Sequence, residues 1–301
     1  MKVGIIGAGA IAGTMAGTIR EMDCAQNYAV AARDYGRAAE FAQTYGFEKA
    51  YGSYEELVED AGVELVYIAT PHSHHYEHIK LCLNHGKHVL CEKSFTVNES
   101  QAREVLALAR EKKLLLTEAI WTRYMPMRKT LDDVLLSGVI GRPYMLTANL
   151  GYIISGKERI MRPELAGGAL LDVGIYPLNF ASMVFGDEVD SITGTAVMTE
   201  TGVDAQNSIT ITYKDGKMAA LCSSAMGLSD RRGIIYGDNG FIEVENINNC
   251  EGIRIYDRSR NMIASYDTPK QISGYEYEVE ACLRAIEEGA LECPEMPHEE
   301  T

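Results

Sequence analysis

The chain has 301 residues, enough for two domains, and its composition of 46% hydrophobic and 24% charged residues is that of a soluble globular protein. A net charge of −15 argues against nucleic acid and anionic membranes as partners, because both are recognised by clustered Lys and Arg. The seven cysteines are scattered and odd in number, which is typical of reduced thiols, so we expect a cytoplasmic protein. No apolar run reaches the roughly 18 residues that span a bilayer.

Short apolar strands alternate with helices over the first 119 residues. Strands are predicted at residues 2–6, 27–33, 63–70, 87–92 and 114–119. Helices are predicted at about 10–21, 36–46, 54–60, 73–86 and 98–113. Continuous apolar strands are buried on both faces, so the alternation predicts a parallel, doubly wound sheet of the Rossmann type, an α/β domain over residues 1–119.

The pattern changes after residue 120. Helices are predicted at 127–136, 170–185 and 275–288, with a strand at 143–152. Further strand-like runs with turn signals between them lie at 191–199, 208–214, 217–225, 233–237, 241–246 and 252–257. Hairpin turns such as "KDGK" and "GDNG" favour antiparallel pairing. We therefore predict a second, α+β domain over residues 120–301 with an open, mostly antiparallel sheet.

The stretch "IIGAGAIAG" has the spacing G-x-G-x-x-A directly after a strand and at the start of a helix. Gly7 permits the tight turn, Gly9 lets a pyrophosphate approach the backbone, and Ala12 allows close packing of helix on strand. The helix N-terminus at Ala10 and Ile11 offers free amides to the phosphates. This pattern predicts a dinucleotide site.

The end of the second strand indicates which dinucleotide is bound. NAD sites usually place an acid there for the ribose 2′-hydroxyl, but here Ala32 stands at that position and Arg33 follows it. A guanidinium can grip a 2′-phosphate, and Arg37 is close enough in sequence to help. We therefore predict that the cofactor is NADP. The alternative is NAD, if Asp34 acts as the acid and Arg33 is only a solvated charge.

Six of the seven histidines lie in "TPHSHHYEHIKLCLNHGKH", residues 70–88. With Ser73 as the N-cap, His74, His78 and His85 share the face away from the apolar stripe and should meet solvent. No Cys or carboxylate completes a metal site nearby, so we predict none. His75 points to the apolar side, as a packed residue would. Ligands bind at the carboxyl ends of strands in such sheets, so we predict a cofactor-binding segment there: Thr70, Pro71, His72 and His75.

Five motifs in order and spacing resemble the glucose–fructose oxidoreductase/inositol dehydrogenase (Gfo/Idh/MocA) family. They are "GIIGAGAIA", "IATPHSHHYEH", "GKHVLCEKS", "EAIWTRY" and "AGGALLDVGIYPL". The branch that the chain most resembles contains dimeric dihydrodiol dehydrogenases and NADP-linked aldose dehydrogenases such as xylose dehydrogenase. The resemblance implies that Glu92 and Lys93 lie at the cofactor, with Lys93 as a catalytic residue. Ser94 departs from the Pro of the family motif.

The segment "DVGIYPL" places Asp172 and Tyr176 four residues apart, on one face of a helix. The resemblance implies that Tyr176 transfers the proton and Asp172 supports it. Reduction of a carbonyl by hydride needs a proton for the developing alkoxide, and a neighbouring ammonium such as that of Lys93 lowers the pKa of a phenol. We therefore predict Tyr176 as general acid/base, Lys93 as its electrostatic partner and Asp172 as the orienting residue. Pro177 predicts a local break in this helix.

The resemblance also implies that Trp121 and Arg123 contact substrate, although Trp121 could instead serve interdomain packing. The expected activity is hydride transfer between NADP and a sugar, polyol or vicinal diol, or its carbonyl form, by an NAD(P)-dependent dehydrogenase. The family resemblance further implies that the domain of residues 120–301 binds substrate and mediates dimerisation, in a homodimer or higher homo-oligomer. Two alternatives stay open: an NAD-dependent glycosidase that recycles its cofactor, and a cofactor-binding regulator without catalysis.

Overall fold

The structure, a computed structural model, describes residues 1–301 and divides into two compact units. The first unit contains residues 1–124 together with 271–301, and the second contains residues 125–270. This division differs from the predicted one, which placed everything after residue 119 in the second domain. The C-terminal segment pairs with a strand of the first unit, because Leu116 N–H donates to Leu291 O (3.1 Å) and His298 Nε2 lies 2.8 Å from Leu116 O.

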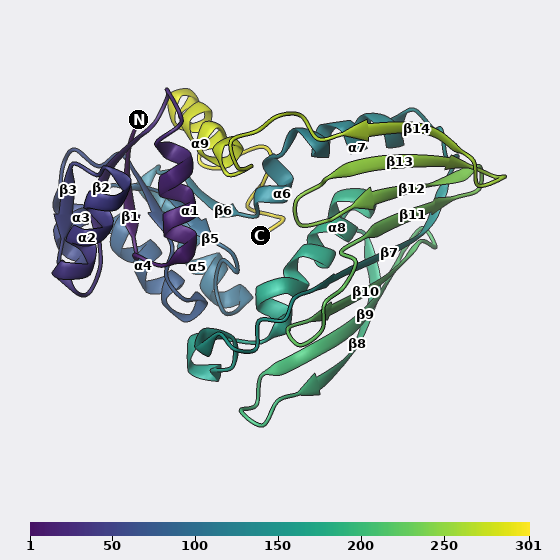
Figure 1. The fold of residues 1–301 in the computed structure, drawn as a ribbon, viewed down its shortest axis with the longest axis horizontal. Coiled ribbons are helices and arrows are strands. Elements are labelled where there is room, and N and C mark those ends of the chain that lie inside the picture. Colours follow the sequence, from purple (N-terminus) through teal and green to yellow (C-terminus); the bar gives the residue numbers. More distant parts are fainter. The chain divides into compact units, whose positions relative to one another are not determined.

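The first unit is built on a parallel sheet with strand order β3-β2-β1-β4-β5-β6 (Figure 1). Its strands are β1 (Lys2–Ile6), β2 (Gln26–Ala31), β3 (Lys49–Tyr51), β4 (Leu65–Ile68), β5 (His88–Glu92) and β6 (Leu116–Ala119). The order reverses between β1 and β4, and ligands of such sheets bind at the carboxyl ends of the strands at this reversal. The doubly wound fold is thus as predicted, except that the three-residue strand β3 was too short to give an apolar pattern.

Helices cover both faces of this sheet (Figure 1). They are α1 (Ala10–Ile19), α2 (Tyr35–Tyr45), α3 (Tyr54–Glu59), α4 (His72–Asn84), α5 (Glu99–Lys112), α6 (Trp121–Tyr124) and α9 (Glu276–Glu288). Three of them begin at a side chain that accepts a hydrogen bond from the amide three residues later: Asp34, Ser53 and Asn98. Helix α4 has Pro71 at its N-cap and begins at His72, so the predicted N-cap at Ser73 was two residues too late.

The core of the first unit lies between the sheet and these helices. Ile6 and Ile68 on adjacent strands are fully buried, as are Ile79 of α4 and Val105 of α5. These are the apolar positions that the strand runs and the helical spacing predicted. Burying each such side chain contributes about 1.5–3 kcal/mol, so the core fixes the strands whose ends carry the candidate site.

The second unit is built on an eight-stranded, mostly antiparallel sheet with order β14-β13-β12-β11-β7-β10-β9-β8. Its strands are β7 (Pro143–Gly151), β8 (Val189–Met198), β9 (Asp204–Tyr213), β10 (Met218–Ser224), β11 (Gly233–Gly237), β12 (Gly240–Glu245), β13 (Gly252–Asp257) and β14 (Met262–Asp267). Only β7 and β10 pair in parallel. The last strand, β14, was not predicted, because most of its side chains are exposed and give no alternating pattern. The helices α7 (Pro126–Leu136) and α8 (Ile175–Phe185) belong to this unit.

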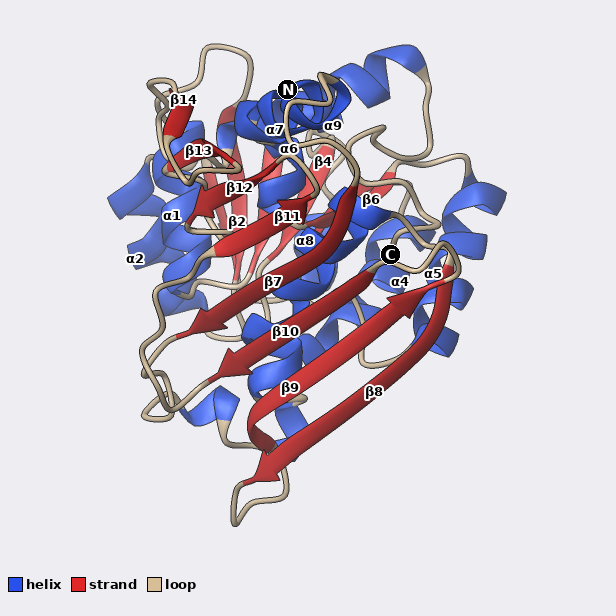
Figure 2. Cartoon of the chain, turned by 90° about the vertical axis from the view of Figure 1, so that its right-hand side faces the viewer, coloured by secondary structure: helices blue, strands red, loops and turns tan.

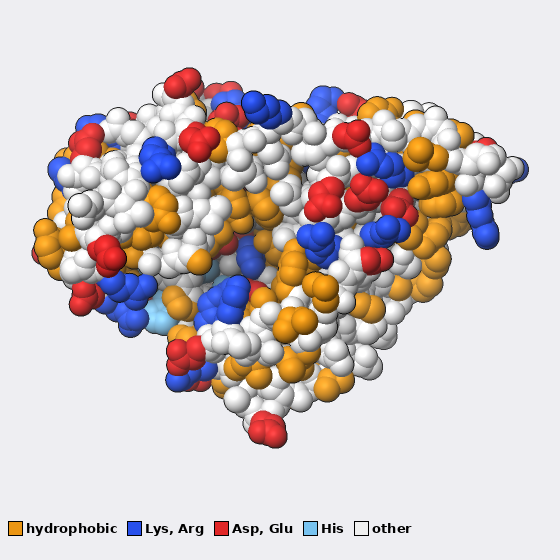
Figure 3. Space-filling view, in the orientation of Figure 1, with side chains coloured by type: hydrophobic (Ala, Val, Ile, Leu, Met, Phe, Trp, Pro, Cys, Tyr) orange, Lys and Arg blue, Asp and Glu red, His pale blue; other side chains and the backbone are white.

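Helix α8 packs on one face of this sheet, whereas the other face carries no helix of the second unit (Figure 2). The approach of α8 is close: a Cβ atom on Gly233 of β11 would lie 2.4 Å from the Phe180 ring. On the open face the half-buried rings of Tyr236, Phe241 and Tyr256 form a ladder across three strands. Hydrophobic side chains gather along the margin of this sheet (Figure 3), so the open face is more apolar than an ordinary solvated surface.

One stretch, Pro163–Phe185, is long and apolar enough to cross a membrane, contrary to the expectation that no apolar run reaches that length. Most of this stretch is buried inside the protein. It includes α8, which packs on the sheet of the second unit. A helix in the core of a globular protein passes the same test of length and composition, so this finding is weak evidence for a membrane span.

Candidate active site

The glycine loop between β1 and α1 has the geometry of a phosphate-binding turn. Gly7 has φ +104°, and a Cβ atom there would lie 2.8 Å from the carbonyl oxygen of Ala69. Gly9 is the N-cap of α1 without a side-chain cap, and a Cβ atom on it would meet nothing within 4 Å. Ala10 is exposed beside it, while Ala12 is fully buried against the sheet. The amides at Ala10 and Ile11 therefore face a space that a pyrophosphate fits.

The predicted phosphate-reading arginines stand at the end of β2. Ala32 is buried and fills the position of the NAD-type acid. Asp34 is occupied as the cap of α2, since its Oδ1 accepts the Arg37 N–H at 2.8 Å. The guanidinium of Arg37 donates from Nη2 to the carbonyl oxygen of Ala8 at 3.0 Å, which holds it against the glycine loop. Arg33 is exposed at the same edge.

The histidines of helix α4 do not form one group. His72 is buried as the first residue of the helix, rather than preceding it as predicted. His75 is fully buried, and both of its ring nitrogens lie 2.8 Å from backbone carbonyl oxygens, Nδ1 from that of Ser94 and Nε2 from that of Thr70. A buried ring engaged in this way joins the two segments. No group of three or more His, Cys, Asp or Glu side chains that could hold a metal ion occurs in residues 1–301.

His78 differs from the prediction that it faces solvent with His74 and His85. Its Nδ1 lies 3.0 Å from the hydroxyl oxygen of Thr70, and its ring packs edge-on against Tyr54 with 4.7 Å between centroids. Helical spacing alone placed these histidines outward. The neighbouring helix α3, which carries Tyr54, covers this part of the surface, so only His85 at the end of α4 is exposed.

Lys93 follows β5 directly and is half-buried. The carboxylate of Glu92 accepts the Lys93 N–H at 3.2 Å and, on its other oxygen, the hydroxyl of the buried Tyr67. Glu92 itself is buried, so it shapes the backbone before Lys93. The peptide bond between Lys93 and Ser94 is cis, and the carbonyl oxygen of Ser94 is the one that meets His75.

Trp121 and Arg123 have partners in the C-terminal segment that sequence reasoning did not find. The indole of Trp121 stacks on Tyr275 with 4.2 Å between ring centroids. Arg123 is buried and donates from Nη2 to Glu300 Oε2 at 2.7 Å. Both partners lie more than 150 residues away along the chain, so no local pattern could have revealed them.

In the second unit, Tyr176 lies in the first turn of α8 and Asp172 lies just before that helix, and both side chains are buried. A π-helical turn, Leu170–Gly174, precedes the α-helix, so Pro177 follows an irregular turn of the kind that the sequence predicted. The carboxylate of Asp172 accepts a hydrogen bond from Arg159 Nη1 at 2.6 Å. Arg159 was missed, because it stands in an irregular loop whose sequence indicates no partner.

Known proteins with similar sequences share the two-part organisation of this chain. Residues 1–120 match a family model described as an oxidoreductase family with an NAD-binding Rossmann fold, and residues 129–243 match the Gfo/Idh/MocA C-terminal domain. The trans-1,2-dihydrobenzene-1,2-diol dehydrogenase of Homo sapiens is 35% identical over 310 residues, covering 100% of this chain and 92% of that protein. The corresponding enzyme of Mus musculus is 38% identical over 250 residues, covering 82% of this chain and 75% of that protein.

Solved structures show the same fold. KijD10, a 3-ketoreductase from Actinomadura kijaniata in complex with NADP, is 25% identical with a TM-score of 0.85, covering 99% of this chain and 91% of that one. An aldose-aldose oxidoreductase from Caulobacter crescentus is 18% identical with a TM-score of 0.90, covering 100% and 92%, and shares the fold.

A Rossmann unit with an open glycine loop, together with a second unit that buries an acid and a tyrosine on one helix, defines a nucleotide-dependent oxidoreductase. It is an NAD(P)-dependent dehydrogenase or reductase. The chain belongs to the Gfo/Idh/MocA oxidoreductase family.

Proposed function

We propose that the enzyme uses NADP and transfers hydride between the nicotinamide and a CH–OH carbon of a sugar, polyol or vicinal diol, or its carbonyl form. One observation carries the cofactor choice: Arg33 follows β2 and Arg37 lies in the first turn of α2, whereas the acid position is Ala32 and the nearby Asp34 caps α2. An NAD site needs a free carboxylate for the ribose 2′-hydroxyl. A 2′-phosphate needs positive charge, which Arg33 and Arg37 supply.

The substrate class is supported by the relatives. The curated relatives are named as dehydrogenases of a vicinal diol, trans-1,2-dihydrobenzene-1,2-diol, and a similar structure is that of a 3-ketoreductase with NADP. All of these names describe a secondary alcohol or its ketone. We propose the same functional group for this enzyme, on a small molecule.

The first unit fits the dinucleotide by its own residues. The space in front of Gly9 and the uncapped amides of α1 suit the pyrophosphate, and the arginines suit the adenosine phosphate. When bound, the nicotinamide would donate or accept the hydride. The chain then has to bind and orient the substrate and supply the proton.

We assign the proton to Tyr176, whose hydroxyl would protonate the substrate oxygen in reduction and remove its proton in oxidation. Lys93 would favour the phenolate through its positive charge and stabilise the developing alkoxide. Asp172 would orient these groups or a substrate hydroxyl, itself held in place by Arg159. Trp121 and Arg123 are the residues we assign to substrate contact.

Titration with NADPH and then NADH tests the cofactor choice. Trp121 is the only tryptophan, so quenching of its fluorescence is a clean signal, and calorimetry gives an independent affinity. We expect NADPH to bind more tightly by about 100-fold, and Arg33→Ala to remove most of that preference, because a bidentate guanidinium–phosphate pair is strong. Preference for NADH in the unmodified enzyme would overturn the assignment and favour a cofactor-recycling glycosidase.

Turnover of Tyr176→Phe tests the catalytic assignment. With NADP and a panel of sugars, polyols and diols, kcat should fall by about 100-fold or more, because general acid–base catalysis contributes that much. Cofactor affinity should stay within about twofold, since the phenol is not assigned to cofactor binding. Tyr152→Phe, another hydroxyl of the second unit that bonds Asn248, is the matched control and should keep its turnover. Turnover of Tyr176→Phe at the unmodified rate would refute the role.

A further inference from the structure

Helix α4 carries a histidine that the oxidoreductase function has not used. His78 is half-buried two turns into the helix, and its side chain points back toward the N-terminal end, as helical side chains do. There its Nδ1 meets the Thr70 hydroxyl at 3.0 Å, just past the carboxyl end of β4. This is the same edge of the sheet at which Arg33 follows β2, because β1 alone lies between β2 and β4.

The surroundings of His78 are rich in positive charge. Tyr54, whose ring packs edge-on against His78, is also within electrostatic range of both Arg33 and Arg37. His74 lies one turn earlier on α4, with 5.8 Å between its ring centroid and that of His78. Lys or Arg side chains and a histidine lie side by side below α2 and α4 (Figure 3). A site of this composition attracts a phosphate.

The charged and titratable groups around His78 come from three elements. Helix α4 contributes His74 and the buried His75, the residues between β2 and α2 contribute Arg33, and α2 contributes Arg37. Helix α3 contributes the phenol of Tyr54, which Glu55 also influences. Burial first, and then electrostatic repulsion from His74, His75 and Arg33, lowers the pKa of His78 to about 4. The ring is therefore neutral at pH 7 before any ligand binds.

The Thr70 hydroxyl suits a ring that changes its protonation. A hydroxyl can either donate or accept, so it can satisfy Nδ1 of His78 whether or not that nitrogen carries a proton. Nε2 is the second ring nitrogen and would serve a phosphate oxygen. A dianionic phosphate among these groups would reverse the local electrostatic balance and favour the imidazolium.

We propose that His78, supported by the Thr70 hydroxyl, is a third ligand for the 2′-phosphate beside Arg33 and Arg37, and takes up a proton when that phosphate binds. The inference rests on the proposed use of NADP. Linkage gives the sign: a group that gains a proton on binding makes the affinity rise as the pH falls. The enzyme would then discriminate more strongly for NADP at lower pH.

Calorimetry with 2′,5′-ADP tests this directly, with 5′-AMP as the probe that lacks the 2′-phosphate. Both are titrated into the 301-residue protein near pH 7 in two buffers of different ionisation enthalpy, which yields the number of protons taken up. The phosphate itself titrates near pH 6, so the informative quantity is the difference between the unmodified protein and His78→Gln. His85→Gln is the matched control, because His85 lies on the same helix but is exposed and bonds only the Leu81 carbonyl.

We expect His78→Gln to bind 2′,5′-ADP about tenfold more weakly and with less proton uptake, while 5′-AMP binds as before. His85→Gln should match the unmodified protein with both probes. Equal affinity and equal uptake in His78→Gln would overturn the proposal, as would an equal loss with both probes, since that would indicate damage to the fold. Arg33→Ala distinguishes a failure of the NADP assignment from a failure of the His78 proposal. If Arg33→Ala leaves the preference for 2′,5′-ADP over 5′-AMP intact, the NADP assignment is wrong. If Arg33→Ala reduces that preference but His78→Gln changes neither affinity nor proton uptake, only the His78 proposal is wrong.

Discussion

The Nδ1 atom of His75 lies 2.8 Å from the carbonyl oxygen of Ser94, and so joins helix α4 to the loop that carries Lys93. The opposite nitrogen lies 2.8 Å from the carbonyl oxygen of Thr70. One buried ring thus spans the ends of β4 and β5. Burial lowers the pKa of His75 and so favours the neutral imidazole, which carries one N–H and donates to only one of these carbonyl oxygens at a time.

His75→Phe removes the ring that bridges the two carbonyl groups and leaves a carbonyl group without its donor. We expect a loss of about 1–3 kcal/mol in the free energy of unfolding, since an unsatisfied buried group costs about that much. His75→Gln keeps a donor and should lose less, with turnover partly retained. Denaturant unfolding and kcat of both variants check this. If His75→Phe matched the unmodified protein in both, the bridging role would be wrong.

Substitutions at Gly7 and Gly9 should have different effects: we expect the first to lower stability and the second to weaken cofactor binding. Gly7→Ala forces a side chain into φ +104° and against the Ala69 carbonyl oxygen, so we expect it to destabilise the fold by about 1–3 kcal/mol. Gly9→Ala meets no protein atom within 4 Å, so the melting temperature should hold while NADPH affinity falls. Thermal melting and cofactor titration of the pair are the measurements. Unchanged NADPH affinity in Gly9→Ala would mean that the pyrophosphate does not lie there.

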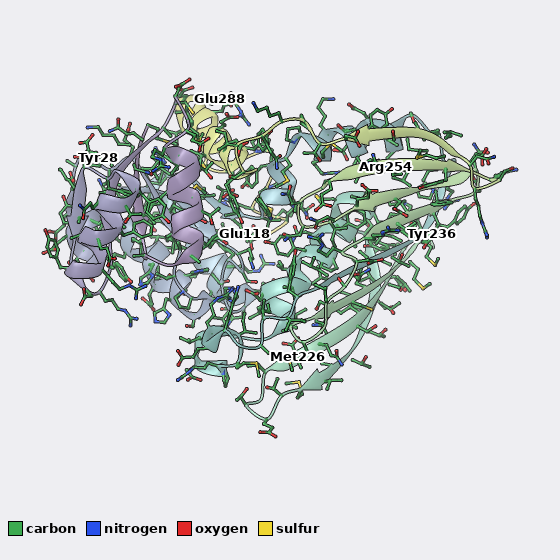
Figure 4. The ribbon with its side chains drawn as sticks, in the orientation of Figure 1. Tyr28, Glu118, Met226, Tyr236, Arg254 and Glu288 are labelled. Carbon is green, nitrogen blue, oxygen red and sulfur yellow. The ribbon has the colours of Figure 1, made fainter.

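Glu118 should make stability depend on pH. This residue of β6 (Figure 4) is buried, and burial raises its pKa to about 7 despite hydrogen bonds from the Phe95 amide and the Thr301 hydroxyl. The folded state therefore holds a proton that the unfolded state releases near pH 4.5. This contribution is complete below about pH 4.5 and is lost as the pH rises to about 7, which amounts to about 3 kcal/mol.

The variant Glu118→Gln mimics the protonated acid at every pH. Its unfolding free energy should fall less between about pH 5 and pH 8 than that of the unmodified protein, so the variant should be relatively more stable at pH 8. Glu111→Gln, an exposed glutamate of α5, is the control for a change of net charge. Parallel pH profiles of Glu118→Gln and the unmodified protein would contradict the assignment.

Arg159 should matter for turnover through Asp172. Arg159→Met removes the charge that holds the buried carboxylate at 2.6 Å, so we expect kcat to fall by about tenfold while NADPH affinity is kept. Arg162→Met is the matched control, because Arg162 in the same loop pairs with the exposed Glu158 and Glu164. Steady-state kinetics of both variants decide the point, and equal kcat values would exclude a role for Arg159.

The open sheet face leads us to propose that a second copy of the chain covers it. Phe241 stacks on Tyr256 there at 4.6 Å between ring centroids. A charge placed among these rings should shift the population from dimer to monomer, so Phe241→Asp should lower the mass measured by sedimentation or light scattering. Leu136→Asp alters an 85% exposed leucine of α7 and serves as the control. If the unmodified protein had the mass of a monomer in the same measurement, the proposal would be wrong.

Local chemistry in the sequence was enough to predict much of the first unit and part of the site. Apolar runs and turn residues predicted five of its strands, and the glycine spacing predicted the turn at Gly7, because a tight turn and an uncapped helix start depend on neighbouring residues alone. Helical spacing placed His75 inward for the same reason, whereas Asp172 lies in the π-helical turn Leu170–Gly174 and Tyr176 in the α-helix that follows.

Other features depended on contacts between distant segments. Tertiary packing decided that His78 is covered by Tyr54, that Asp172 pairs with Arg159, and that residues 271–301 join the first unit. Each of these contacts joins two segments that are distant in the sequence, and the local sequence pattern of each segment is compatible with several tertiary arrangements. Burial of apolar surface and pairing of charges select one of them only once the whole chain has folded, so the tertiary structure alone could decide them.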